Sequence, residues 1–306
     1  MTIRPILRLC LEPVLLKSAA AGEHNFVNLL IETVEKSRFR VEFCPDTEAE
    51  LFKPVSDNVY TLAHMIQPPS GRGLVFRRAY HYPFWQIDST AERWKWDVAK
   101  ATFNQEEIPQ KEAQRFAAFW KKRLFGNAPV QADRRGYVYV PLQGKISMHR
   151  TFQSCSPLEM LTQTLIHCDG REVVATLHPK EIYTGAERAA LDQLDKRYSH
   201  LTIDTGNMEK HLLHCDYVVT QNSSAAFAGY FFGKPALLFA GIDFHHIAVR
   251  ADMNNLALSF AEVALHEPGY PAYIWWFWQH QSINAGKDDA VTRIAARFRR
   301  FGWPIE

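Results

Sequence analysis

The feature of this sequence that most restricts its fold is a regular alternation of strand-like and helix-like segments over residues 137–241. Each apolar, β-branched run is followed by a helical pattern. The nine segments are 137–142, 156–167, 172–177, 184–198, 201–206, 207–215, 216–221, 223–233 and 235–241. Such an alternation is typical of a parallel, doubly wound sheet with right-handed crossovers. We therefore expect a Rossmann-like α/β domain in the second half of the chain.

The N-terminal half carries a less regular α/β pattern. Residues 24–52 predict a helix, a strand and a second helix, and short strands are expected at 60–62 and 73–77. A chain of 306 residues exceeds the usual size of one hydrophobic core. The predicted fold class is thus α/β with two Rossmann-like domains. We place the domains at 1–130 and 131–250, with a polar linker at 126–136.

Three helical patterns follow the alternating region, at 251–266, 270–284 and 288–302. They predict a C-terminal helical extension, 251–306, that packs back across the domains. Four consecutive aromatic residues at 275–278 cannot share one helical face, which favours packing between domains over a membrane-interface role. The last helix has a basic face, which either is solvated or docks on anionic lipid.

Composition excludes several classes of function. The formal net charge of +2 is too small to indicate nucleic-acid binding, although it suits an anionic ligand or membrane surface. Five scattered cysteines without a C-x-x-C spacing predict buried, reduced thiols in a cytoplasmic protein. No apolar run is long enough to span a membrane. No Asp-x-Asp sequence occurs, so dependence on a metal is not indicated. No cofactor is expected.

Polar residues follow two of the predicted strands directly. His178, Pro179 and Lys180 come after the strand at 172–177, and Ser223 and Ser224 come before the helix at 223–233. Open α/β sheets bind ligands at the carboxyl ends of their strands. The serine pair also places hydroxyl and backbone N–H groups at a helix N-terminus, where phosphate binds. The sequence therefore predicts a site for a phosphorylated ligand at this edge of the sheet.

Four motifs together resemble the nucleotide-binding half of capsular-polysaccharide glycosyltransferases, which include bacterial enzymes that use CMP-activated Kdo or sialic acid. The motifs are Val140-Pro141-Leu142-Gln143, His178-Pro179-Lys180-Glu181, Asn222-Ser223-Ser224 and Gly233-Lys234-Pro235. The resemblance covers residues 137–247 and leaves the N-terminal half unmatched. It implies a GT-B-like transferase of surface polysaccharide synthesis, cytoplasmic or peripheral at the inner membrane, with a saccharide or glycolipid acceptor.

The resemblance also implies roles for residues at the strand ends. His178 would donate a hydrogen bond to a phosphate or nucleotide oxygen, Pro179 would fix its turn, and the serine pair would bind phosphate. The remaining residues assigned to substrate binding are Gln143, Lys145, Arg150, Lys180, Asn222 and His245. Without a metal, cationic groups such as Lys145, Arg150 and Lys180 would stabilise the leaving phosphate.

The catalytic base is expected in the aromatic stretch at 77–103. Its rings either wedge the two domains together or line an acceptor site, since aromatic faces stack on sugars. Asp88 and His81 are the chosen bases there, with His149 and the His245–His246 pair in reserve. In the same stretch, residues 89–92 have the spacing of a capping box, so a helix is expected to begin there.

Two departures from the family pattern favour a second hypothesis. Kdo-type relatives carry acidic residues after the glutamine of the first strand, whereas residues 144–150 here contain none. Many relatives have a glutamate where this chain has Ala228. The alternative is a non-catalytic protein that binds nucleotide or polysaccharide within a capsule assembly or export complex. A nucleotide-sugar epimerase is a third reading, but no catalytic carboxylates can be placed for it.

Overall fold

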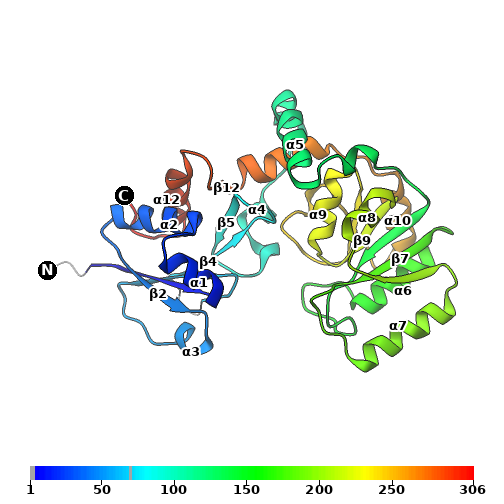
Figure 1. The fold of residues 1–306 in the computed structure, drawn as a ribbon, viewed down its shortest axis with the longest axis horizontal. Helices are drawn as coiled ribbons and strands as arrows, with labels where there is room; N and C mark the ends of the chain where they lie inside the picture. Colours follow the sequence, from blue (N-terminus) through cyan, green and yellow to red (C-terminus); the bar gives the residue numbers. More distant parts are fainter. Residues whose placement is uncertain (1–3, 69–70) are drawn as a thin grey trace. The chain divides into compact units, whose positions relative to one another are not determined.

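The computed structural model describes residues 4–68 and 71–306, which form two compact units (Figure 1). Unit 1 is Met1–Lys100 with Phe277–Glu306, and unit 2 is Ala101–Trp276. These bounds differ from those expected from the sequence. Residues 101–130 belong to unit 2, and residues 277–306 return to unit 1. The predicted α/β class with two Rossmann-like sheets is confirmed.

Unit 1 contains a six-stranded sheet whose first four strands run parallel. The two strands that come last in the sequence are at one edge of the sheet, and each pairs in antiparallel fashion with the strand before it. In spatial order the strands are β12 (Ile283–Asn284), β5 (Phe84–Asp88), β4 (Gly73–Arg78), β3 (Val59–His64), β1 (Ile6–Leu11) and β2 (Arg40–Pro45). The chain order reverses beside β1, which lies between β2 and β3.

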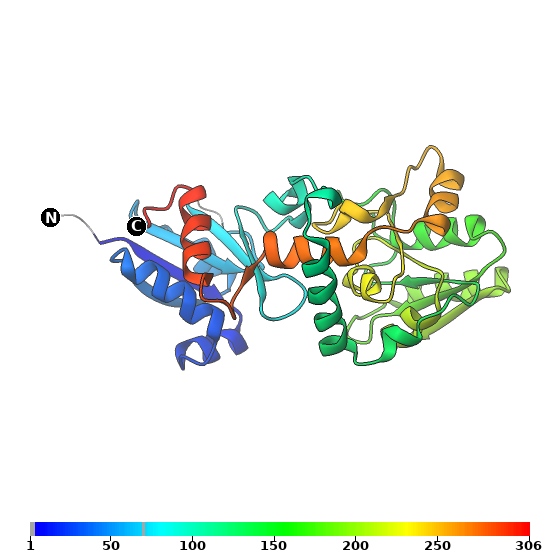
Figure 2. The same ribbon diagram turned by 90° about the horizontal axis from the view of Figure 1, so that it is seen from above.

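Helices from both ends of the chain complete unit 1. They are α1 (Pro13–Ala20), α2 (Asn25–Lys36), α3 (Glu48–Leu51), the 3₁₀ turn η1 (Arg93–Lys95), α4 (Asp97–Lys100) and α12 (Ala290–Arg300). Figure 2 shows α12, in red, beside α2, in blue. Ile294 and Phe298 of α12 enter the same core as Leu7 and Leu9 of β1, together with Phe26 of α2. The C-terminal segment is therefore part of the first core.

Unit 2 contains a six-stranded sheet in which every pair of strands is parallel. In spatial order the strands are β11 (Val249–Arg250), β10 (Ala236–Leu238), β9 (Tyr217–Thr220), β6 (Tyr137–Pro141), β7 (Glu172–Leu177) and β8 (Leu201–Thr205). From β6 the chain winds outward through β7 and β8, and then returns to the other side with β9, β10 and β11. The order therefore reverses between β6 and β9.

The helices of unit 2 cover both faces of this sheet. They are η2 (Gln105–Glu107), α5 (Gln110–Phe125), η3 (Ala128–Gln131), α6 (Pro157–His167), α7 (Gly185–Arg197), α8 (Met208–His214), α9 (Ser224–Phe231), η4 (His245–Ile247), α10 (Leu256–Leu265) and α11 (Tyr270–Trp275). Helices α6, α7 and α10 pack on the face that carries Val138 and Val140. On the other face, Tyr139 stacks on His211 of α8 at 5.2 Å.

Two helix predictions are wrong. No α-helix begins at residues 89–92, because Asp88 accepts the backbone N–H groups of Ser89 and Asp97 and folds the chain into a turn before η1 and α4. The helix expected at 270–284 ends at Trp275. It passes into a π-helical turn, η5 (Trp276–His280), and then into β12. Pairing of Ile283 with Trp85 overrides the helical pattern there.

The aromatic and basic residues of the C-terminal segment are engaged within the fold. Trp276 and Trp278 are buried, and Trp278 donates its indole N–H to the Ala79 carbonyl. On α12, Arg297 pairs with Asp88 at 3.1 Å, and Arg300 pairs with Asp97. All five cysteines are buried and free of disulfides. Across residues 4–68 and 71–306, no helix has the length and apolar character needed to cross a membrane.

Candidate functional site

The strongest candidate site lies at the carboxyl ends of β6 and β9, where the strand order of unit 2 reverses. Ligands of open α/β sheets bind at such a switch point because the connecting loops diverge there. The two strand ends are joined by a hydrogen bond from the Thr220 hydroxyl to the Pro141 carbonyl, at 3.3 Å. Gln143 follows β6, and Asn222 follows β9 with 8% of its surface exposed.

The loop after β6, residues 142–156, is fastened to the end of β10. Ser154 donates its N–H to the Phe239 carbonyl at 2.7 Å, and Gly241 donates to the Phe152 carbonyl at 2.9 Å. Within the loop, the Arg150 N–H donates to the Gln153 side chain at 2.8 Å. The His149 ring donates from Nε2 to the Gln153 carbonyl at 2.8 Å. This hydrogen bond leaves Nδ1 of His149 as the acceptor when the ring is neutral.

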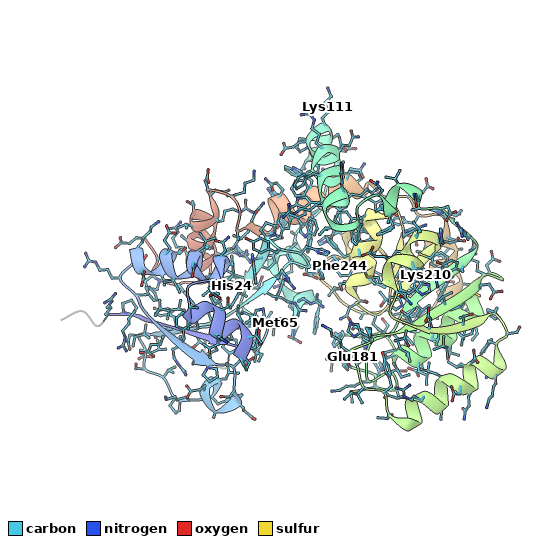
Figure 3. The ribbon with its side chains drawn as sticks, in the orientation of Figure 1. His24, Met65, Lys111, Glu181, Lys210 and Phe244 are labelled. Atoms are coloured by element: carbon cyan, nitrogen blue, oxygen red, sulfur yellow. The ribbon has the colours of Figure 1, made fainter. Side chains whose placement is uncertain are left out.

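The loop after β7 is tied to the loop after β6 by Tyr183, a residue that sequence reasoning missed. Its hydroxyl accepts the His178 backbone N–H at 2.9 Å and donates to the Leu142 carbonyl at 3.4 Å. Glu181, labelled in Figure 3, lies against Gly144, because a Cβ atom placed on Gly144 would come within 2.3 Å of Glu181 Oε2. A carboxylate from the β7 loop therefore occupies the space beside the β6 loop.

The orientation of His178 is set by its own turn. Its Nδ1 accepts the Lys180 backbone N–H at 3.2 Å. Since Nδ1 is an acceptor, the neutral ring carries its proton on Nε2, which becomes a hydrogen-bond donor. The side chains of His178, Pro179 and Lys180 are all exposed. The structure thus gives His178 the donor character that a phosphate or nucleotide oxygen requires.

Helix α9 differs from α6 and α7, the helices that follow β6 and β7 at this edge. Helices α6 and α7 begin with capping boxes, Ser156–Glu159 and Thr184–Glu187. Backbone N–H groups of Ser156 and Thr184 lower the pKa of these glutamates, so both helix ends carry a negative charge at neutral pH. Ser223 caps α9 alone, and the first turn of α9 contains no acidic residue. The positive end of its dipole therefore has no acidic residue in the helix's own first turn.

Three buried polar atoms near the switch point have no hydrogen-bond partner among the described residues. They are Nε of Arg150, Nε2 of Gln153 and Oε1 of Gln221. Gln221 is 5% exposed and donates its other amide group to the Cys155 carbonyl at 3.0 Å. Unpaired buried groups are uncommon and indicate a site for water or ligand. Gln153 and Gln221 were missed because their burial depends on contacts distant in sequence.

Two further cationic residues and a histidine predicted for the site lie in the segments that follow β6 and β10. Lys145 is exposed in a left-handed turn with φ of 60°, and the Arg150 guanidinium lies 5.0 Å from the Phe152 ring centroid. Backbone N–H groups of Ile146 and Ser147 reach the Glu187 carboxylate and hold that turn in place. His245 follows β10 in η4 and stacks on His246 at 4.3 Å.

Asp88 and His81 belong to unit 1 and have different surroundings. Asp88 is 2% exposed, and its oxygens accept from Ser89, Asp97 and Arg297. Burial raises the pKa of Asp88. His81 is half-buried, and burial together with Arg78 lowers its pKa to about 4. Its ring is therefore neutral at pH 7. In the described part of the chain, no cluster of three or more His, Cys, Asp or Glu side chains is placed to hold a metal ion.

No family model and no curated protein matches this chain. Among solved structures, it is similar to a β-Kdo 2,7 transferase of KpsC from Thermosulfurimonas dismutans, with 11% identity, 88% of each chain covered and a TM-score of 0.47. The β-Kdo 2,4 transferase of the same KpsC has 13% identity, a TM-score of 0.48, and coverage of 89% of this chain and 97% of that one.

A UDP-GlcNAc 2-epimerase from Neisseria meningitidis, bound to UDP-GlcNAc, has 9% identity, a TM-score of 0.37, and coverage of 97% of this chain and 100% of that one. Similarities of this size assign neither a reaction nor a substrate to the chain.

Proposed function

We propose that the protein is a glycosyltransferase that uses a nucleotide-activated sugar, with a CMP-linked acid sugar favoured, in bacterial capsular or surface polysaccharide synthesis. The observation that carries this proposal is the N-terminus of α9 at the β6–β9 switch point, where the first turn of the helix contains no acidic residue. A phosphate group fits such a position because backbone N–H groups and the helix dipole both favour an anion. The motif resemblance in residues 137–247 supports the same reading.

The donor nucleotide is assigned to unit 2. Ser224 and the first N–H groups of α9 would bind its phosphate, while Nε2 of His178 donates a further hydrogen bond. Lys145, Arg150 and Lys180 would stabilise charge on the leaving phosphate. Gln143, Pro179, Asn222 and His245 complete the proposed substrate-binding set.

The candidate bases are His81, Asp88, His149 and Glu181. We retain His81 ahead of Asp88, because the neutral imidazole can accept a proton whereas the Asp88 oxygens already accept three structural hydrogen bonds. His149 remains a candidate through its acceptor nitrogen. Glu181 is a further candidate base. Its carboxylate lies next to Gly144, beside the 144–150 segment, which contains no acidic residue of its own.

Thermal unfolding with CMP, UDP, GDP and their sugars tests donor binding. A ligand at 100 times its dissociation constant adds about 2.7 kcal/mol of stability if it binds only the native state. We expect Ser224→Ala and His178→Ala each to weaken the affinity for the ligand by a factor of about 10 or more. The stabilisation at a given ligand concentration should fall accordingly. Ser199→Ala, an exposed serine between α7 and β8, is the matched control. Unchanged affinity in both site variants would refute the site.

The non-catalytic alternative is favoured by one observation, namely the absence of acidic residues at 144–150. It predicts the same nucleotide binding, with no transfer of sugar to any acceptor. Measuring sugar transfer by the wild type and by Glu181→Gln distinguishes the glycosyltransferase from the non-catalytic binding protein. Loss of turnover with intact donor affinity supports the enzyme and a role for Glu181. Donor binding without turnover in the wild-type protein, over a panel of saccharide acceptors, supports the alternative.

A further inference from the structure

We propose that unit 1 has an anion-binding site in which Arg78, together with His24 and His64, binds a carboxylate or phosphate group of a ligand. The inference extends the proposed function to a second ligand. Identifying this ligand as the sugar acceptor rests on the proposed glycosyltransferase activity. Binding of the anion itself does not depend on any transfer activity. The two can therefore fail separately.

Strand pairing places these residues over one face of the unit 1 sheet. His64 ends β3, pairs with Phe76 of β4, and has its ring 5.1 Å from the Phe76 ring. Arg78 is two residues further along β4, so it faces the same side. It pairs with Trp85 of β5, and the Trp85 ring meets the His24 ring edge-on at 5.5 Å. Arg78 and both histidines therefore share one surface.

This surface lies beside the second point at which strand order reverses. Strand β1 has β2 on one side and β3 on the other, so the carboxyl ends of β1 and β3 form the switch point of unit 1. His64 is the last residue of β3. Figure 3 labels His24 and also Met65, the residue that follows His64. The general rule for ligand sites in open α/β sheets thus applies here as it does in unit 2.

Arg78 supplies a positive charge that forms no ion pair with the acidic side chains of residues 4–68 and 71–306. Its side chain is exposed and makes no ion pair or hydrogen bond with the residues that the structure describes. Burial is the main cause that lowers the pKa of His24 and takes that of His64 to about 4, and Arg78 contributes to both shifts.

The other charged groups that face His64 do not cancel this charge. Arg77 and His24 lower its pKa further, and Glu12 is the acid that raises it. Both Glu12 oxygens already accept backbone N–H groups at the start of α1, from Val14 at 3.0 Å and Leu15 at 2.9 Å. Glu12 therefore caps α1, and its single carboxylate faces the guanidinium groups of both Arg77 and Arg78, so the surface retains an excess of positive charge.

The donors on this surface suit an oxyanion. A guanidinium forms charge-assisted, bidentate hydrogen bonds with carboxylate or phosphate. Nδ1 of His24 accepts the Val27 N–H at 3.2 Å, which leaves the proton of the neutral ring on Nε2 as a second donor. A bound anion would offset the charge of Arg78 and raise the pKa of both histidines. By linkage, the anion should then bind more tightly as pH falls from 7 towards 5.

The test is an NMR titration of the full-length protein that follows the histidine ring signals. Glucuronic acid and glucose 1-phosphate are the carboxylate and phosphate probes, and glucose is the neutral probe. We expect the anionic probes to shift the His24 and His64 signals and glucose to leave them unchanged. Arg78→Gln should weaken binding by a factor of 10 or more. Arg72→Gln, which removes another exposed arginine of unit 1, should bind as the wild type does.

Each outcome decides the proposal. Response to one anionic probe alone assigns the ligand to that class, and response to both assigns it to oxyanions in general. Equal affinity in Arg78→Gln and wild type, equal response to glucose, or no saturable shift in the wild type would overturn the site. If Arg78→Gln melts early, His64→Gln provides the comparison, with the His24 signals as the readout. Anion binding without nucleotide binding to unit 2 would refute the proposed function and leave this site standing.

Discussion

At the scale of single residues, Tyr183 joins two loops of the candidate site through one hydroxyl. Tyr183→Phe leaves the His178 backbone N–H without this acceptor and should destabilise unit 2 by about 1–3 kcal/mol. It should also weaken nucleotide binding, since the His178 turn loses its anchor. Tyr198→Phe is the control, because its ring packs at the edge of the same core. Equal urea midpoints for the two variants would contradict this role of Tyr183.

The cysteine pair of unit 1 gives a second prediction at this scale. Cys10 and Cys44 are register partners on β1 and β2, and their sulfur atoms lie 2.8 Å apart. Paired positions on adjacent strands fall within the Cα separation that a disulfide requires. Diamide should therefore oxidise this pair in preference to the other three thiols, with the loss of two hydrogens detected by mass spectrometry. Cys155→Ser should not change the product, whereas Cys44→Ser should abolish it.

At the scale of elements, helix α9 begins with two serines whose surroundings differ. Ser223 is buried and caps the helix by accepting the Ala225 N–H at 3.3 Å, whereas the Ser224 side chain is exposed. Ser223→Ala should therefore lower the free energy of unfolding by about 0.5–2 kcal/mol. Ser224→Ala should change it by less than about 0.5 kcal/mol. Chemical denaturation of both variants without ligand tests the difference, and equal losses would contradict it.

The attachment of α12 should depend on pH through Asp97. A hydrogen bond from Arg300 is the main cause that lowers the pKa of Asp97, and Arg297 adds to it. The carboxylate therefore contributes stability above the unfolded pKa of about 3.9 and loses it as pH falls through the lower, folded value. Burial raises the pKa of Asp88, so its contribution has the opposite sign.

Asp97→Asn isolates this effect. Its unit 1 should be less stable than the wild type at pH 7, and the difference should shrink towards pH 3. Urea unfolding at the two pH values measures it. Asp57→Asn is the matched control, because Asp57 is an exposed acid of the same unit. A difference that stays constant with pH would show that the Asp97 charge does not hold α12.

Sequence predicted the elements whose signals are local. The alternation over residues 137–241 places strands, helices and strand-end polar residues correctly. It failed where distant partners decide. Strand β12 forms because Ile283 pairs with Trp85. The hydrogen bonds by which Tyr183 joins the two loops cannot be inferred from the sequence, because they form only when both loops are folded. The position of the candidate residues at strand ends was thus predictable, whereas their hydrogen-bond partners were not.

At the scale of the whole molecule, unit 2 is continuous in sequence and unit 1 is not. A fragment of residues 101–276 should fold alone and retain nucleotide binding. A fragment of residues 1–100 should not, because it lacks Ile294, Phe298 and Trp303 of the first core. Circular dichroism melting of both fragments checks this. A cooperative transition in the 1–100 fragment near that of the full chain would contradict it.

Because unit 1 is formed from both ends of the chain, the two units should fold in a fixed order during synthesis on the ribosome. Unit 2 can fold as soon as it emerges, but the first hundred residues must wait for residues 277–306. At 5–20 residues per second, the intervening synthesis takes about 10–40 s. During that time the apolar face that α12 will cover remains exposed to chaperones and to neighbouring nascent chains.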